Sequence, residues 1–126
     1  MTRPREGDTH RFERSFTPEE VRQFADLSGD EQSRHLEPDD EGRLLVHGLL
    51  TATMPTKIGG ELEVLGRSMA FDFHRPVYTG ETLTCEMEID TVSVRDDHYE
   101  LEGSVTCWND SDEDVMTGSV EGLVWK

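Results

Sequence analysis

The sequence is poor in cationic residues, and in lysine above all. Lys and Arg total 12 of 126 residues against 28 Asp and Glu, so the formal net charge at pH 7 is −16, and only Lys57 and Lys126 are lysines. Nucleic-acid-binding domains and proteins that dock on anionic lipid need a basic surface. We therefore expect neither nucleic acid nor a membrane among the partners of this protein.

Long apolar runs are also missing. No stretch approaches the roughly 20 apolar residues that span a bilayer, and the N-terminal residues lack the apolar core of a secretory signal. The two cysteines, Cys85 and Cys107, are too few for a disulfide framework, and we expect two buried thiols. These absences predict a cytoplasmic protein.

The acidic excess indicates the solvent in which the chain works. Repulsion among like charges destabilises a compact state at low salt. At about 1 M salt the Debye length falls to about 3 Å, and the repulsion largely disappears. We interpret the composition as that of a halophilic protein.

Length and periodicity predict one domain over residues 1–126. Thr17 and Glu20 form the pattern of a capping box around Pro18, so a helix is expected from Pro18 to a stop at Gly29. A short strand is expected before it, over residues 11–16. These signals place the first helix near the N-terminus.

A second helix is expected from His47 to Ile58, with Gly59-Gly60 as its stop. Lys57 is its only formally charged residue, and an almost uncharged helix in so charged a chain is expected to be buried. Pro55 removes a backbone hydrogen bond, so we expect a kink there or a regular part that ends near Met54.

Most of the remaining chain alternates apolar and polar residues with period two, which is typical of antiparallel strands with one wet face. The alternating runs cover residues 69–74, 82–90, 99–108 and 116–124. They predict an α+β fold, in which a curved antiparallel sheet wraps around one central helix.

Reactive side chains gather in the loop after the first helix. Asp30 and His35 stand close enough in sequence to act on one water as an acid–base pair. The N–H of Gly48, at the start of the buried helix, is placed to stabilise negative charge on an oxygen. From spacing alone, an Asp and a His in an acidic loop more often form a solvated turn and a helix cap than a catalytic pair. No standard metal-ligand spacing is present, and we predict no metal site.

Residues 16–30 with His35, together with residues 46–51 and 71–83, resemble the MaoC-like (R)-specific enoyl-CoA hydratases, and the resemblance extends from about Phe16 to Val124. It implies a single hot-dog domain, a homodimer or larger homo-oligomer, and an acyl-CoA substrate with no further cofactor. It implies a lyase, a trans-2-enoyl-CoA hydratase reversible as an (R)-3-hydroxyacyl-CoA dehydratase, in fatty-acid metabolism or polyhydroxyalkanoate supply.

The resemblance also implies roles for single residues. Asp30 as main base and His35 activate the water that adds to C3, and the N–H of Gly48 binds the thioester carbonyl. The residues that we assign to substrate binding are Gln32, His47, Leu49, Thr56 and Arg75.

The chain departs from the family pattern at Gln32-Ser33-Arg34, where the family has Asn-Pro and a hydrophobic residue, and at Pro55. Two other functions stay open. One is a hot-dog acyl-CoA thioesterase, although residues 47–60 contain none of the carboxylates that such enzymes often place on the central helix. The other is a non-catalytic module that binds acyl thioesters. Acyl-chain length and the choice between CoA and carrier-protein substrates stay open as well.

Overall fold

The first helix begins and ends at its capping residues. In the computed structural model, which describes residues 3–126, helix α1 spans Pro18–Ser28. The hydroxyl of Thr17 accepts a hydrogen bond from the N–H of Glu20, and the Glu20 carboxylate accepts one from the N–H of Thr17, so the capping box is confirmed. Gly29 ends the helix at φ 79°. Since Asp30 follows directly, this cap determines where the acidic loop starts.

The central helix is interrupted earlier than the sequence predicts. It forms as α3 (Gly48–Thr51) and α4 (Thr53–Glu61), which meet at Ala52 rather than at Pro55. The ring of Pro55 conflicts with the carbonyl four residues before it, so the irregularity falls one turn ahead of the proline. The hydroxyl of Thr53 donates to the Leu50 carbonyl at 2.6 Å beside the break.

The helix also extends further than predicted. Helix α4 runs through Gly59 and Gly60 to Glu61, so the expected stop at these glycines is wrong. Glycine inside a helix costs about 1 kcal/mol relative to alanine. The buried side chains of Met54 and Ile58 anchor α4 on the core, and this packing outweighs the local preference. Within residues 3–126, no helix combines the length and the hydropathy needed to cross a membrane.

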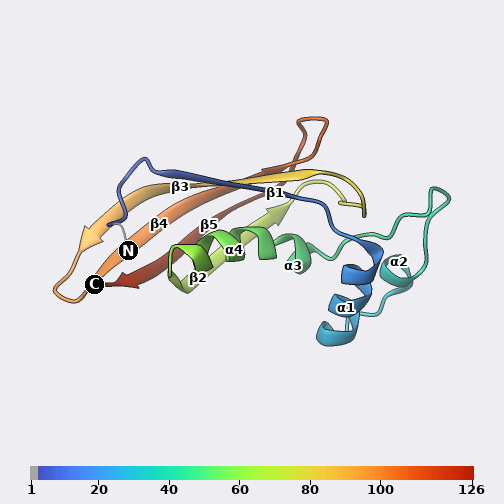
Figure 1. Ribbon diagram of the computed structural model, residues 1–126, viewed down its shortest axis with the longest axis horizontal. Helices are drawn as coiled ribbons and strands as arrows, with labels where there is room; N and C mark the ends of the chain where they lie inside the picture. The colour runs from blue at the N-terminus through green and yellow to red at the C-terminus, as the bar shows by residue number, and fades with distance from the viewer. Residues whose placement is uncertain (1–2) are drawn as a thin grey trace.

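In the described part of the chain, five antiparallel strands make one sheet in the order β1-β3-β4-β5-β2. Helix α4 lies along one face of this sheet, while α1 and the short α2 (Ser33–Leu36) lie beyond one of its ends (Figure 1). This is the predicted hot-dog architecture, and the short helix α2 was not foreseen. The strands are β1 Thr9–Arg14, β2 Leu65–Phe73, β3 Leu83–Val94, β4 His98–Trp108 and β5 Asp114–Trp125.

The core lies between the central helix and the inner face of the sheet. Cys85 on β3 pairs directly with Cys107 on β4, and both are fully buried free thiols, as the sequence predicts. The hydrogen bond with Cys85 raises the pKa of the Cys107 thiol, and burial raises it further. Both cysteines therefore act as small apolar side chains.

Strand β2 departs from the expected pattern of one buried and one wet face. Within residues 3–126 it is an edge strand that pairs only with β5, and all of its side chains are exposed except the half-buried Phe71. Met69 is 59% exposed and Phe73 50% exposed. A long edge strand with exposed apolar side chains is a ready template for pairing with another chain.

Candidate active site

The acidic residue of the site is held by its neighbours in the loop. The N–H of Asp30 donates to the hydroxyl of Ser28 at 3.1 Å, and the amide of Gln32 donates to Asp30 Oδ1 at 2.8 Å. The Gln32 hydrogen bond lowers the pKa of Asp30 below its ordinary value. The carboxylate is therefore ionised at neutral pH, and its second oxygen, Oδ2, stays free of Gln32.

His35 faces that second oxygen. Its Nδ1 lies 2.7 Å from the carbonyl of Leu45, which only accepts, so Nδ1 carries the proton and the neutral ring keeps a lone pair on Nε2. Nε2 lies 3.6 Å from Asp30 Oδ2. That separation is too long for a good direct hydrogen bond, and it suits a water that contacts both atoms. The pair has the geometry of a water-binding acid–base site.

His47 contacts both residues of this pair and holds them in position. Its Nε2 donates to the Asp30 carbonyl at 2.9 Å, and its ring stacks on His35 with centroids 3.7 Å apart and an interplanar angle of 17°. Phe24 of α1 packs edge-on against the same ring at 4.9 Å. His47 is 3% exposed, so it orders the loop and does not face the cleft described below.

The same three residues form the cluster best placed for a metal, since ligand atoms of Asp30, His35 and His47 lie within 4.8 Å of one another. A metal ion sits in the plane of each imidazole that binds it, at about 2.0–2.1 Å for zinc. Two nearly parallel rings 3.7 Å apart do not direct their lone pairs at one point. The arrangement fits water-based acid–base chemistry better than metal binding.

Gly48 begins α3 beside the acid–base pair. Among residues 3–126 no group accepts a hydrogen bond from its N–H, which leaves the donor available to a ligand oxygen. A Cβ at this position would lie 3.1 Å from the ring of Phe73, so glycine lets β2 approach the helix. An N–H placed this way can stabilise negative charge that develops on a carbonyl oxygen.

A cleft of about 440 Å³ opens at His35 and Gly48, and Thr51 and Phe73 line it as well, whereas Asp30 is not part of its lining. Thr51 and Phe73 were not predicted as site residues. Phe73 belongs to an alternating strand, and nothing in its sequence context says that its ring lies against the start of a distant helix. The start of the central helix and the end of β2 therefore both contribute to the cleft.

The predicted substrate-binding residues fall into separate groups. Gln32 and Arg75 line the cleft, where Arg75 also pairs with Glu113 at 3.3 Å. Leu49 is 67% exposed and does not line the cleft. The hydroxyl of Thr56 donates to the Ala52 carbonyl at 2.9 Å, and Thr56 lines a second cavity further along the helix.

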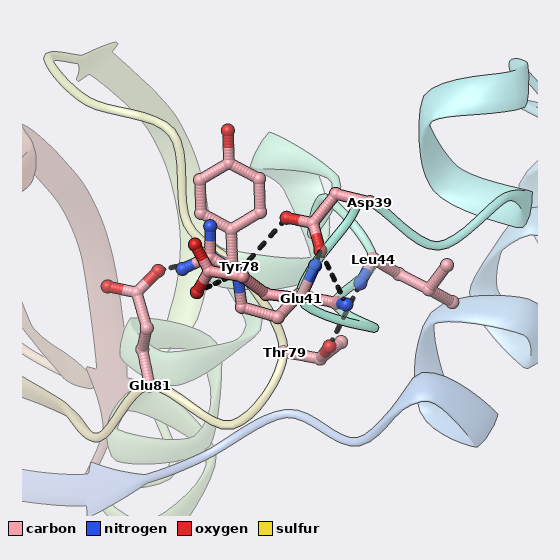
Figure 2. Close-up of polar contacts among 7 residues, drawn as sticks. Asp39, Glu41, Leu44, Tyr78, Thr79 and Glu81 are labelled. Atoms are coloured by element: carbon pink, nitrogen blue, oxygen red, sulfur yellow. Dashed lines mark hydrogen bonds and ion pairs between the residues drawn. The ribbon is translucent and has the colours of Figure 1, made fainter.

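The acidic loop between His35 and His47 is tied down by polar contacts (Figure 2). The Arg43 guanidinium pairs with Asp39 at 3.1 Å and stacks over the ring of Tyr78 at 4.2 Å. The N–H of Leu44 donates to the hydroxyl of Thr79 at 3.0 Å. These contacts hold the neighbouring Leu45 carbonyl, which orients the His35 ring.

Comparisons with known proteins agree with this architecture. Residues 8–118 match the model of a family described as FAS1-like, dehydratase domain region. An (R)-hydratase from A. caviae involved in PHA biosynthesis is 25% identical, with a TM-score of 0.82 over 94% of this chain and 96% of that one.

Two further solved structures share the fold. R-Hydratase PhaJ1 from Pseudomonas aeruginosa is 19% identical, with a TM-score of 0.84 over 94% of this chain and 81% of that one. The HadBC (3R-hydroxyacyl-ACP dehydratase) complex from Mycobacterium tuberculosis is 19% identical, with a TM-score of 0.71 over 94% and 96% of the two chains. A sequence search of curated proteins found no match.

Proposed function

This chain belongs to the FAS1-like dehydratase-region family, and from that premise we propose that it is an (R)-specific trans-2-enoyl-CoA hydratase, reversible as a 3-hydroxyacyl-CoA dehydratase. One observation carries the proposal. Asp30 Oδ2 and His35 Nε2 lie 3.6 Å apart, and His35 lines the same cleft as Gly48, whose N–H has no acceptor among residues 3–126. A water-activating pair and an oxyanion donor are the groups that hydration of an α,β-unsaturated thioester requires.

The proposed reaction uses water held between Asp30 and His35. Asp30 takes one proton from the water as its oxygen bonds to C3, and the electrons of the C2–C3 double bond move toward the thioester carbonyl. The protonated Asp30 then returns that proton to C2, which completes a net addition of water. His35 accepts the second hydrogen of the water as a hydrogen bond, and the Leu45 carbonyl keeps its ring in the required tautomer.

Gly48 stabilises the enolate-like oxygen in this scheme. Its N–H meets the thioester carbonyl, which gains negative charge as the water adds. Loss of one such donor costs about 3–4 kcal/mol of transition-state stabilisation. We propose no metal and no cofactor beyond the thioester substrate itself.

A thioesterase is the second candidate, and the central helix argues against it. The only carboxylate on α3 and α4 is Glu61 at the last position, where it is exposed and pairs with Lys57. Glu61 is not among the residues that line the cleft. A non-catalytic binding module is the third candidate, and the contact from Gln32 to Asp30 argues against it, because the altered loop orients the carboxylate.

We propose that the protein works as a homodimer that pairs along β2. The edge strand exposes Leu65, Met69 and Phe73, and Leu49 on α3 is exposed as well. Backbone pairing of two β2 strands would satisfy the open edge and cover these side chains. Since Phe73 lines the cleft, the dimer would also close one wall of the site.

The experiment is hydration of crotonyl-CoA by the purified protein at high KCl. Asp30→Asn removes the base and should lower kcat/KM by about 100-fold or more. Asp26→Asn is the matched control, because Asp26 is an exposed residue of α1 and loses the same charge. Near-normal activity of Asp30→Asn, with its circular dichroism unchanged, would overturn the proposal.

A further inference from the structure

A buried threonine hydroxyl belongs to the reactive cleft, about one helix turn after Gly48. Thr51 is the last residue of α3, it is 2% exposed, and it lines the same cleft as His35 and Gly48. Several of the other lining residues are apolar, Phe73 and Val115 among them. A buried hydroxyl is unfavourable unless it has a hydrogen-bond partner. The proposed hydration has so far assigned this hydroxyl no role.

Among residues 3–126 the hydroxyl of Thr51 finds only a weak partner. It donates to the His47 carbonyl at 3.4 Å, which is long for a hydrogen bond between two oxygens. The same carbonyl accepts the N–H groups of Leu50 and Thr51 at 3.0 Å each, and these two bonds occupy its two lone pairs. The Thr51 hydroxyl is therefore a surplus donor on this carbonyl and is available to a ligand oxygen.

The other two threonines of the central helix differ from Thr51. The hydroxyl of Thr53 donates to the Leu50 carbonyl at 2.6 Å, and that of Thr56 donates to the Ala52 carbonyl at 2.9 Å. Neither residue lines the cleft. The helical threonine with the poorest intramolecular hydrogen bond is thus the one that lines the cleft.

Helix geometry directs the Thr51 side chain toward Gly48. Residues three apart lie on one face of a helix, and their side chains lean toward its N-terminus. The N–H of Gly48 is the first of the helix and meets no intrahelical carbonyl, so it points out of the helix start. Both residues line the cleft. The two donors are therefore directed at the same region of the cleft.

We propose that the hydroxyl of Thr51 is a catalytic donor to the thioester oxygen, so that Thr51 and the N–H of Gly48 together form an oxyanion site with two donors. The inference rests on the proposed function, since it takes the thioester carbonyl to be bound at Gly48. As water adds to C3, the electrons of the C2–C3 bond move toward this oxygen, and the second donor stabilises the charge that gathers there. The hydroxyl keeps its own proton, because the proton from the water passes to Asp30 and then to C2.

Thr51→Val tests this role, because it removes the hydroxyl and keeps the shape of the side chain. Its kcat for crotonyl-CoA hydration should fall about 100-fold, with KM changed by less than about threefold. Its Tm should equal or exceed that of the wild type, because the lost contact at 3.4 Å is weak. Thr51→Ser keeps the hydroxyl and should restore most of the rate. Thr51→Ala also lacks the hydroxyl, and it repeats the measurement with no added bulk in the cleft.

Thr53→Val is the matched control, because it makes the same chemical change on the same helix at a residue outside the cleft lining. The Thr53 hydroxyl makes a normal hydrogen bond, so its loss should lower Tm by about 4 °C while kcat is kept. A loss of rate without a loss of Tm is thus expected only at Thr51. Wild-type kcat in both Thr51→Val and Thr51→Ala would overturn the inference.

An infrared measurement makes the result independent of turnover. Saturated butyryl-CoA with an isotope-labelled thioester carbonyl is bound to each variant, and the carbonyl stretch is recorded by difference spectroscopy. A hydrogen bond lowers this frequency, so the band should lie lower in the wild type and in Thr53→Val than in Thr51→Val.

The two measurements separate this inference from the proposed function. Hydration with a rate that does not depend on Thr51 overturns the inference and leaves the proposed function standing. A carbonyl band that depends on Thr51, without hydration, overturns the proposed function alone. A band at the same frequency in all variants overturns the contact between Thr51 and the thioester.

Discussion

Gly118→Ala should detach the edge strand that closes the site. Gly118 on β5 pairs with Phe71 on β2. A Cβ at 118 would lie 2.4 Å from the Ala70 carbonyl oxygen and 2.5 Å from Cδ1 of Phe71. One of these contacts is with backbone, so a side-chain rotation cannot relieve the overlap. The strand itself must move, and it carries Phe73 away from Gly48.

The size of the effect follows from these contacts. Overpacking in a well-packed interior costs about 1–3 kcal/mol, and a clash with backbone belongs at the upper end, near 3 kcal/mol. For a chain of 126 residues the unfolding entropy is about 0.26 kcal/mol/K, so each kcal/mol lowers Tm by about 4 °C. Gly118→Ala should therefore lower Tm by about 10 °C.

The assay is thermal unfolding followed by circular dichroism, with every variant in the same high-KCl buffer. Ser119→Ala is the control, because Ser119 is the exposed neighbour on the opposite face and its change should stay within about 0.5 kcal/mol. Crotonyl-CoA hydration should fall with Gly118→Ala, since Phe73 shifts. A Tm equal to that of Ser119→Ala would refute the packing argument at this strand pair.

Three further outcomes are expected. Below about 0.5 M KCl, where screening weakens, activity and dimerisation should fall together, and full activity in dilute buffer would contradict the halophilic interpretation. Gln32→Ala removes the hydrogen bond that lowers the pKa of Asp30, so that pKa rises and the acid limb of the kcat/KM profile moves to higher pH; an unmoved limb would show that Asp30 is not the base. Met69→Lys should give a monomer by light scattering, because Met69 lies on the exposed β2 edge, and a persistent dimer would place the interface elsewhere.

Local signals account for the parts of the fold that the sequence predicts well. The caps of α1 depend on contacts between near neighbours, from Thr17 to Glu20 and from Gly29 to Ala25, so the pattern alone is sufficient. The burial of Cys85 and Cys107 follows from the period of two in their strands, whereas their direct pairing also depends on the register shift between Ile89 and Thr91. The local sequence did not predict that Gly59 and Gly60 are helical. They continue α4 because Met54 and Ile58 pack this helix on the core.

The candidate site also contains some residues that local sequence predicts and others that only distant contacts determine. Asp30, His35 and Gly48 were predicted as a group, and the structure brings His35 and Gly48 to one cleft with Asp30 at 3.6 Å from His35. The positioning role of His47 and the wall formed by Phe73 depend on contacts between residues far apart in sequence. The sequence carries no local signal for such contacts, so only the folded arrangement assigns these roles.

Hydration of crotonyl-CoA at high KCl, with chiral analysis of the product, tests the central claim most directly. The account predicts loss of the enoyl thioester, formation of (R)-3-hydroxybutyryl-CoA, and no release of free thiol. It predicts that Asp30→Asn lowers kcat/KM for this conversion by about 100-fold or more, while Asp26→Asn retains it. Release of free CoA without hydration would instead indicate a thioesterase, and an (S) product or full activity of Asp30→Asn would contradict the proposed mechanism.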